Sequence, residues 1–357
     1  MRCPQLNELP PPPSGRKGWP WTEESPQLPA TRTDGSPLPR VTVVTPSYNQ
    51  VDFLEETIRS VLLQGYPDLE YIIMDGGSTD GSVEIIQKYA PWLAYWVSEK
   101  DGGQADAINK GWRRATGEVL TWLNSDDTLA PESLKVTVTA LGDDPQVELV
   151  YGNVTTVDSD AQKPRLIHGS SFVPEAVLIQ GRNPIPQPGF LMKRRLWERV
   201  GELDPQMHFC MDFDYWSRMA LQGVRAVYLD CVLAHFRQHA EAKTSVQHKI
   251  RIANRLRVFE KVFASPDLPL DYREHYATAR NQVALTAAYI AYKASDASLT
   301  REYAWEYLRR ARLRSAPSAI FLLFSASGGR WIMQMVKRLL VLARRHRPNT
   351  SESERSN

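Results

Sequence analysis

Small polar and acidic residues follow four successive apolar segments in the first half of the chain. These polar clusters are residues 45–49, 75–81, 99–103 and 124–127. The last cluster contains adjacent aspartates, Asp126 and Asp127, whose charges repel each other unless a cation or hydrogen-bond donors offset them. Mg²⁺ and Mn²⁺ prefer carboxylate oxygens and commonly bind one or two of them together with substrate phosphates. The residue types therefore indicate a phosphate ligand that is bridged to the protein by a metal ion.

The segments before these clusters alternate between two patterns. Residues 41–45, 69–74, 93–97 and 118–123 are apolar and partly β-branched, which predicts strands. Residues 53–62, 83–86 and 104–115 have the spacing of amphipathic helices. Strand–helix alternation with short connections predicts a parallel sheet covered on both faces. Because ligands of such sheets bind beyond the carboxyl ends of the strands, we expect the four clusters to meet at one edge.

Each cluster alone also has an ordinary structural explanation. The Asp-Gly sequences at 75–77 and 100–103 are typical of turns, and Asp126 and Asp127 could cap a helix predicted around 131–140. Their coincidence at successive strand ends is what favours a ligand site. Neither G-x-G-x-x-G after the first strand nor G-x-x-x-x-G-K-[ST] is found, which argues against a dinucleotide dehydrogenase and a P-loop NTPase.

Length, composition and charge narrow the class of protein. The 357 residues suggest about two domains. A content of 42 % hydrophobic and 24 % charged residues is typical of a soluble globular chain. The net charge of +2 argues against a partnership with nucleic acid. Three cysteines without a C-x-x-C pair favour a reducing compartment, and the first residues lack a signal peptide's apolar core, so we expect a cytoplasmic protein.

Four regions are expected along the chain. They are a Pro-rich extended arm at 1–40, a catalytic domain at 41–249, a helical region with a basic amphipathic end at 250–345, and a disordered tail at 346–357. The apolar run near the end is broken at 328–330 and is too short to span a membrane. It either lies on the anionic inner face of the membrane, as a peripheral contact, or packs on its own domain with a solvated basic face. The sequence leaves both readings open.

Taken together, the motifs resemble a known family. Residues 41–127 resemble the nucleotide-binding half of family 2 glycosyltransferases, which are inverting enzymes with the GT-A fold, and the similarity continues through 188–190, 200–204 and 211–216. The resemblance implies an α/β fold of the GT-A nucleotide-diphospho-sugar transferase type. Its central sheet would be mostly parallel, and the C-terminal helical region would follow it.

The resemblance also assigns residues to the nucleotide sugar. They are Thr45, Pro46, Tyr48, Asp75, Asp101, Gly102, Asp126 and Arg237. Asp75 would accept a hydrogen bond from the base, for which uracil is the expected identity. Arg237 would stabilise the diphosphate leaving group, although an arginine between surface histidines often has no chemical role.

The metal site implied by the resemblance contains Asp127, Asp126 and His239, with Mn²⁺ or Mg²⁺ as the cofactor. Asp127 would contact the metal, while Asp126 would contact the ribose or the sugar and could also reach the metal. Asn124 stands where many relatives carry a further aspartate, so the identity of the coordinating atoms stays open.

The general base implied by the resemblance is Asp212, with Asp214 as the alternative. The family places this aspartate after a glutamate, whereas here Met211 precedes it. Asp212 could instead be a helix N-cap.

These assignments predict a metal-dependent, inverting glycosyltransferase that moves one sugar from a UDP-linked donor to an acceptor hydroxyl. A glycan or lipid-linked acceptor in polysaccharide or cell-envelope synthesis would suit the basic end of the chain. The Gln-x-x-Arg-Trp motif of processive relatives is altered, because Ser327 precedes Arg330 and Trp331 in place of the glutamine. A non-catalytic nucleotide-sugar-binding scaffold stays open as an alternative. A nucleotidyltransferase is a weaker one because residues 45–50 lack a Gly-rich basic loop, and a glycosidase is weaker still.

Overall fold

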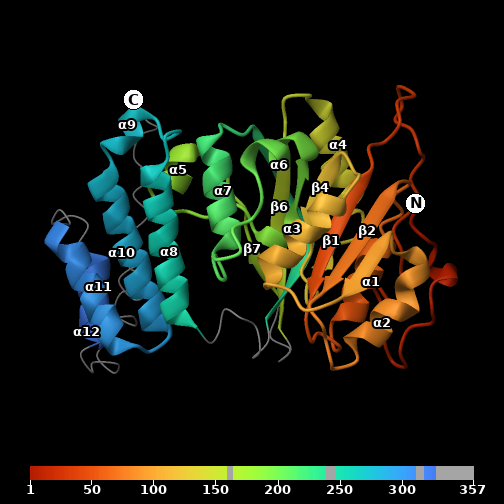
Figure 1. Cartoon of the computed structure of the whole chain (residues 1–357), viewed down its shortest axis with the longest axis horizontal. Helices are drawn as coiled ribbons and strands as arrows, with labels where there is room; N and C mark the ends of the chain where they lie inside the picture. Colours follow the sequence, from red (N-terminus) through yellow and green to blue (C-terminus); the bar gives the residue numbers. More distant parts are fainter. Residues whose placement is uncertain (159–163, 239–246, 311–316, 327–357) are drawn as a thin grey trace, which may run out of the picture. The chain divides into compact units, whose positions relative to one another are not determined.

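The computed structural model describes residues 1–158, 164–238, 247–310 and 317–326, which form two compact units (Figure 1). The first unit runs from Met1 to His275, and the second begins at Tyr276. Helix α8 (His248–Ala264), which begins the helical region expected at 250–345, is part of the first unit. The tail predicted at 346–357 and the basic segment from 327 onward lie outside the described residues.

A mixed sheet forms the centre of the first unit, in the order β3-β2-β1-β4-β8-β6-β9-β5, with β7 paired to β6. The parallel half consists of β1 (Val41–Ser47), β2 (Leu69–Asp75), β3 (Tyr95–Ser98) and β4 (Val119–Trp122). The second half consists of β5 (Thr128–Leu129), β6 (Leu149–Asp158), β7 (Arg165–Ile167), β8 (Phe190–Lys193) and β9 (Ala226–Gln238). Strand β8 is antiparallel to both β4 and β6, whereas β6 and β9 are parallel. The predicted parallel strands are therefore confirmed.

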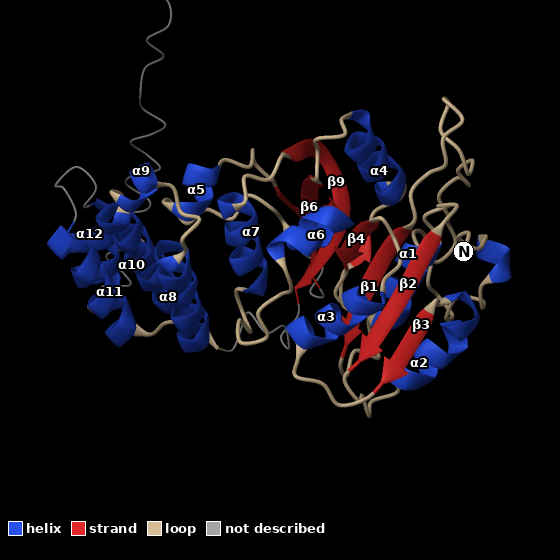
Figure 2. Cartoon of the chain, turned by 45° about the horizontal axis from the view of Figure 1, so that its top comes forward, coloured by secondary structure: helices blue, strands red, loops and turns tan. Residues whose placement is uncertain are grey.

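Helices cover this sheet, as Figure 2 shows. Those of the first unit are α1 (Leu54–Leu62), α2 (Ser82–Tyr89), α3 (Gln104–Arg114), α4 (Ser133–Asp143), α5 (Pro174–Leu178), α6 (Arg194–Val200), α7 (Met211–Leu221), α8 and α9 (Leu270–Arg273). Short 3₁₀ turns lie at η1 (Leu6–Glu8), η2 (Ala90–Trp92) and η3 (Gln187–Gly189). Helix α3 packs on β1 and β2, and Gly111 permits this close approach because a Cβ there would lie 2.5 Å from Val44 Cγ1. Every residue of β1 is buried, as expected of a strand inside a covered sheet.

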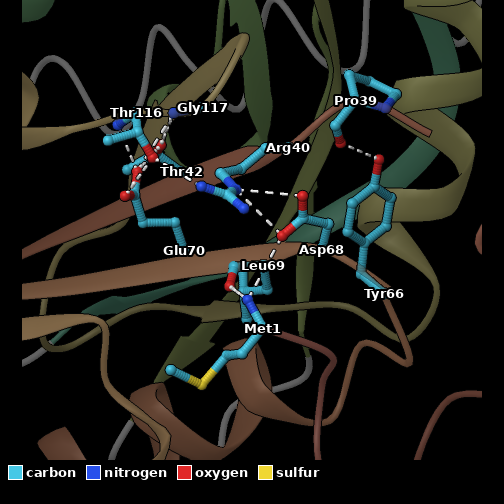
Figure 3. A network of polar contacts seen from close by, with 10 residues as sticks. All are labelled: Met1, Pro39, Arg40, Thr42, Tyr66, Asp68, Leu69, Glu70, Thr116 and Gly117. Atoms are coloured by element: carbon cyan, nitrogen blue, oxygen red, sulfur yellow. Dashed lines mark hydrogen bonds and ion pairs between the residues drawn. The ribbon is translucent and has the colours of Figure 1, made fainter. Parts of the chain in front are cut away.

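A hydrogen-bonded cluster ties the amino ends of the central strands together (Figure 3). The Glu70 carboxylate on β2 accepts hydrogen bonds from the Thr42 hydroxyl on β1 at 2.6 Å and from the Thr116 amide and hydroxyl at 2.7 Å each. The Gly117 amide adds a longer bond at 3.3 Å. Burial alone would raise the pKa of Glu70, but these bonds outweigh it and lower that pKa. The ionised carboxylate therefore joins β1, β2 and the segment that leads into β4.

The Pro-rich residues 1–40 lie along the first unit and are held by a buried arginine. Arg59 on α1 is 0 % exposed. Its guanidinium donates to the carbonyls of Pro10, Pro20 and Trp21 at 2.8–3.1 Å and to the Tyr89 hydroxyl at 3.1 Å. Because these carbonyls belong to the arm, one side chain supplies hydrogen bonds that an otherwise irregular segment needs.

The described part of the second unit is helical. It contains α10 (Tyr276–Lys293), α11 (Ala297–Arg310) and α12 (Pro317–Ala326). Its core is built on the small side chains Ala284, Ala288 and Ala304, with Tyr307 and Leu322. Among the described residues, no helix combines the length and the apolar character that crossing a bilayer requires.

Candidate active site

A cavity of about 800 Å³ opens where the parallel strands end. In Figure 2 the arrowheads of β1, β2 and β3 point to one edge of the sheet, and residues just beyond these strands line the cavity. All four predicted polar clusters contribute to its wall, through Ser47, Gly76, Asp101 and Asp126 among others. The structure therefore brings together segments that the sequence placed at successive strand ends.

Several residues predicted for the nucleotide line this cavity, and others lie behind its wall. Pro46, Tyr48 and Asp101 line it, and Tyr48 is 62 % exposed. Thr45 is buried, with its hydroxyl 3.0 Å from the Tyr71 hydroxyl. The backbone N–H of Gly102 donates a hydrogen bond to the Asp106 carboxylate at 2.9 Å, and Gly102 is not among the residues that line the cavity.

Asp75, predicted to bind the base, is 2 % exposed and shapes its own loop. Its Oδ2 accepts hydrogen bonds from the amides of Gly77 and Ser78 and from the Ser98 hydroxyl, at 3.1, 2.8 and 2.6 Å. Its Oδ1 accepts one from the Ser78 hydroxyl. These four bonds hold the loop so that Gly76 and Gly77 form part of the cavity wall.

The two aspartates of the predicted metal motif have different environments. Asp126 lines the cavity, whereas Asp127 is 1 % exposed. Asp127 Oδ1 accepts the backbone N–H of Arg237 at 3.0 Å, and its Oδ2 accepts the Asn124 amide at 3.1 Å. Burial first, and then the charge of Asp126, raise the pKa of Asp127 well above its ordinary value. A cation beside these carboxylates would offset that repulsion, so the residues fit a divalent metal.

The protein supplies few further ligands in the part of the chain that the structure describes. No group of three or more His, Cys, Asp or Glu side chains suitable for a metal is found within those residues. His239, the third predicted ligand, lies outside them. A metal held mainly by Asp126 would take its remaining ligands from a bound phosphate or water, which is how Mg²⁺ is commonly bound.

Arg237 at the end of β9 lines the cavity and is held by three contacts. Its guanidinium lies 5.0 Å from the centre of the Phe53 ring, pairs with Glu56 at 3.0 Å and donates to the Asp126 carbonyl at 3.1 Å. The predicted phosphate-binding arginine is therefore positioned next to the metal motif, 111 residues away in sequence.

The two base candidates are separated clearly. Asp212, in the first turn of α7, lines the cavity and accepts a hydrogen bond from the Asn183 amide at 3.1 Å. Burial raises the pKa of Asp212 above its ordinary value. Asp214 is 1 % exposed and is paired with Arg218 at 3.0 Å and with Lys261. Of the two carboxylates, only Asp212 is among the residues that line the cavity.

Two carboxamides that were not predicted, Gln104 and Gln187, lie in the same wall on either side of Asn124. Gln104 donates to Asn124 Oδ1 at 2.6 Å, and Asn124 donates to Gln187 Oε1 at 2.8 Å. Gln187 in turn donates to the Trp122 carbonyl at 3.3 Å. These side chains come from three distant segments, so no local spacing reveals their contacts with one another. A visible signal was the alternation of Asn183 and Gln187 with prolines in residues 183–188.

Comparisons with known proteins agree with this architecture. The family model "Glycosyl transferase family 2" matches residues 42–201. An uncharacterized glycosyltransferase of Mycobacterium tuberculosis strain H37Rv is 33 % identical over 202 residues, which cover 56 % of this chain and 75 % of the relative. TuaG of Bacillus subtilis, whose name refers to teichuronic acid biosynthesis, is 41 % identical over 100 residues, which cover 27 % of this chain and 40 % of that protein.

Solved structures share the fold. A mannosyltransferase of Pyrobaculum calidifontis, solved with GDP-Man and Mn²⁺, has a TM-score of 0.55 at 22 % identity and covers 92 % of this chain and 90 % of its own. TarS of S. aureus also has a TM-score of 0.55, at 15 % identity, and covers 81 % of this chain and 53 % of its own. The predicted GT-A type α/β fold is thereby confirmed. Since a relative above 30 % identity is matched over three quarters of its length, this chain belongs to glycosyltransferase family 2 and is a glycosyltransferase.

Proposed function

We propose that the protein transfers a single sugar from a UDP-linked donor to an acceptor hydroxyl, with a divalent cation and with inversion at the anomeric carbon. The observation that carries the proposal is that one cavity is lined both by Asp126 of the metal motif and by Asp212. Two of the structures with this fold bind a nucleotide sugar, GDP-Man in one and UDP-GlcNAc in another. Their different bases mean that the nucleotide must be tested directly.

The diphosphate would lie beside Asp126 and Arg237. A bound Mn²⁺ or Mg²⁺ would supply positive charge to the departing diphosphate. Asp126 would hold that cation, with His239 as a further ligand. Asp127 would act from behind the wall, since its two oxygens already accept bonds from Arg237 and Asn124. Arg237 would provide a second positive charge to the phosphates.

Asp212 would remove the proton of the acceptor hydroxyl as that hydroxyl attacks the anomeric carbon. A carboxylate with a raised pKa is a better proton acceptor than an exposed one, provided that it is still ionised at the working pH. Burial gives Asp212 this property. Since the hydroxyl attacks directly, no side chain needs to act as a nucleophile, and one displacement inverts the centre.

The biological setting is proposed from one similarity and one feature of the sequence. TuaG is named for teichuronic acid biosynthesis, which is consistent with the proposed glycan or lipid-linked acceptor in cell-envelope synthesis. A peripheral position at the cytoplasmic face of the membrane would bring the site to such an acceptor. The basic segment after residue 327 would make that contact.

A donor panel tests the proposal. The purified chain is incubated with UDP-glucose, UDP-GlcNAc and GDP-mannose, with and without Mn²⁺, and release of the nucleoside diphosphate is followed. We predict Mn²⁺-dependent release of UDP from a UDP-sugar, with water as the acceptor in this assay, and NMR recorded before the released sugar mutarotates should show an inverted anomeric centre. Release without metal, or a retained centre, would contradict it.

A further inference from the structure

We propose that residues 183–187 form a rigid spacer whose two terminal carboxamides set the position of the general base relative to the metal motif. Asn183 contacts Asp212 at one end, and Gln187 contacts Asn124 at the other. The inference rests on the proposed roles of Asp212 and Asp126. It adds Asn183, Gln187 and the prolines between them as positioning residues.

The Asn183 end holds the base. Asn183 Nδ2 donates to Asp212 Oδ2 at 3.1 Å, and Asn183 Oδ1 accepts the backbone N–H of Ile185 at 3.3 Å. Because its oxygen is bound within its own segment, the amide presents its N–H group to the carboxylate. Asp212 therefore receives a donor from a fixed direction.

The Gln187 end holds the metal motif. Gln187 Oε1 accepts one hydrogen of the Asn124 amide at 2.8 Å, and the other hydrogen goes to Asp127 Oδ2 at 3.1 Å. Asn124 thus needs both of its donor hydrogens. An aspartate at this position has none, and it would place a carboxylate against Asp127. The amide at 124 is what permits this connection.

Alternating prolines stiffen the segment between these ends. Pro184 and Pro186 have their φ fixed by the ring, and each also restricts the residue before it to extended conformations. Pro186 has φ −63° and ψ 118°, in agreement with this expectation. Ile185 is 1 % exposed, so its side chain anchors the middle of the segment. The distance between Asn183 and Gln187 therefore cannot change freely.

Such a spacer matters because Asp126 would hold the donor's diphosphate through the metal, while Asp212 would activate the acceptor hydroxyl that attacks this donor. A displacement of about 1 Å between reacting groups can lower a rate on the order of 100-fold. We expect loss of the Asn183 amide and loss of the Gln187 amide to have different effects, because the first contacts the general base and the second contacts the metal motif.

The test compares Gln187→Leu, Asn183→Ala and the double variant Pro184→Ala/Pro186→Ala with wild type. Gln222→Ala serves as a matched control, since Gln222 also donates to a carboxylate, that of Asp267 at 2.9 Å, at the surface. Calorimetry measures Mn²⁺-dependent binding of UDP, GDP and dTDP. Turnover is measured against pH, and thermal melting reports folding.

Each variant has a defined expected result. Gln187→Leu should weaken Mn²⁺-dependent nucleotide binding by up to about tenfold, because re-ordering the freed Asn124 and the metal motif on binding should cost no more than the one hydrogen bond that held them. Asn183→Ala should leave that binding unchanged and move the acidic limb of turnover to higher pH, because the amide stabilises ionised Asp212. Arg255 is the charged group that favours the ionised form of Asp212, and Cys210 is a neighbouring titratable group.

The double proline variant should lower turnover at saturating donor while each amide contact remains chemically possible. If all three variants behave like Gln222→Ala, the spacer is wrong. If Gln187→Leu and Asn183→Ala cause the same loss together with the same drop in melting temperature, the segment has only a structural role. A wild-type protein that binds none of the nucleotides would overturn the proposed function, and the spacer with it.

Discussion

Replacing Asp212 by asparagine should lower turnover strongly and leave folding intact. Asparagine has nearly the same shape, and its side-chain oxygen can still accept the amide of Asn183. Loss of a general base lowers a rate by about 10²–10⁴-fold, or about 2.7–5.4 kcal/mol of barrier. The unfolding free energy should stay the same or rise, because burial raises the pKa of Asp212 and so disfavours its ionised form at neutral pH.

Asp214→Asn is the matched control, because it lies two residues away on the same helix. Asp214 is buried and pairs with Arg218 and Lys261. Breaking a fully buried ion pair costs about 3–5 kcal/mol, and we expect about 2–3 kcal/mol here because Lys261 is 34 % exposed and can be solvated. Turnover per folded molecule should be retained.

The assay measures nucleoside diphosphate release at saturating donor, normalised to the folded fraction from urea unfolding. Calorimetric titration with Mn²⁺ and UDP should give the same affinity for both variants as for wild type. Asp212→Asn with near wild-type turnover would refute the base assignment. So would loss of turnover in a fully stable Asp214→Asn protein.

Three further outcomes follow from the contacts described above. Arg59→Met leaves three carbonyls of the N-terminal arm without their donor, which costs about 1–3 kcal/mol for each carbonyl that is buried. The free energy of unfolding measured in urea should therefore fall by at least about 3 kcal/mol, and an unchanged midpoint would contradict this. Glu70 has a lowered pKa because bonds from Thr42 and Thr116 outweigh burial, so its stabilisation is complete above the ordinary value of about 4.3 and is lost as pH falls through the folded value. The unfolding free energies of wild type and Glu70→Gln should therefore converge at low pH, and a constant difference would refute the sign. Arg237→Gln should weaken nucleoside diphosphate binding by about 10- to 100-fold, as expected for a bond to a charged group, and equal affinities in calorimetry would exclude a phosphate contact.

Much of the fold could be predicted because local pattern and topology agree in the first half of the chain. The strand predicted at 41–45 is contained in β1, and the helix predicted at 53–62 is α1 with one residue fewer. The strand predicted at 93–97 begins only at Tyr95, because η2 occupies the preceding turn. Strand β5 has two residues and pairs with β9, more than 100 residues away, so no local signal could reveal it.

The site was predictable in residue type but not in detail. Adjacency placed Asp126 and Asp127 together, but it could not show that one lines the cavity while the other is buried behind it. Asp75 was recognised as a strand-end carboxylate, yet only the folded loop shows that four bonds from its own neighbourhood occupy it. Its proposed contact with the base stays a prediction. Asn183 was missed because its partner Asp212 is 29 residues away.

In the function proposed above, the cavity binds a nucleoside diphosphate through a metal held by Asp126. Calorimetric titration of wild type and Asp126→Asn with UDP, GDP and dTDP, each with and without Mn²⁺, tests it most directly. We predict binding of UDP that requires Mn²⁺ in wild type and is lost in Asp126→Asn. Equal binding with and without Mn²⁺, or an unchanged affinity in the variant, would contradict the account.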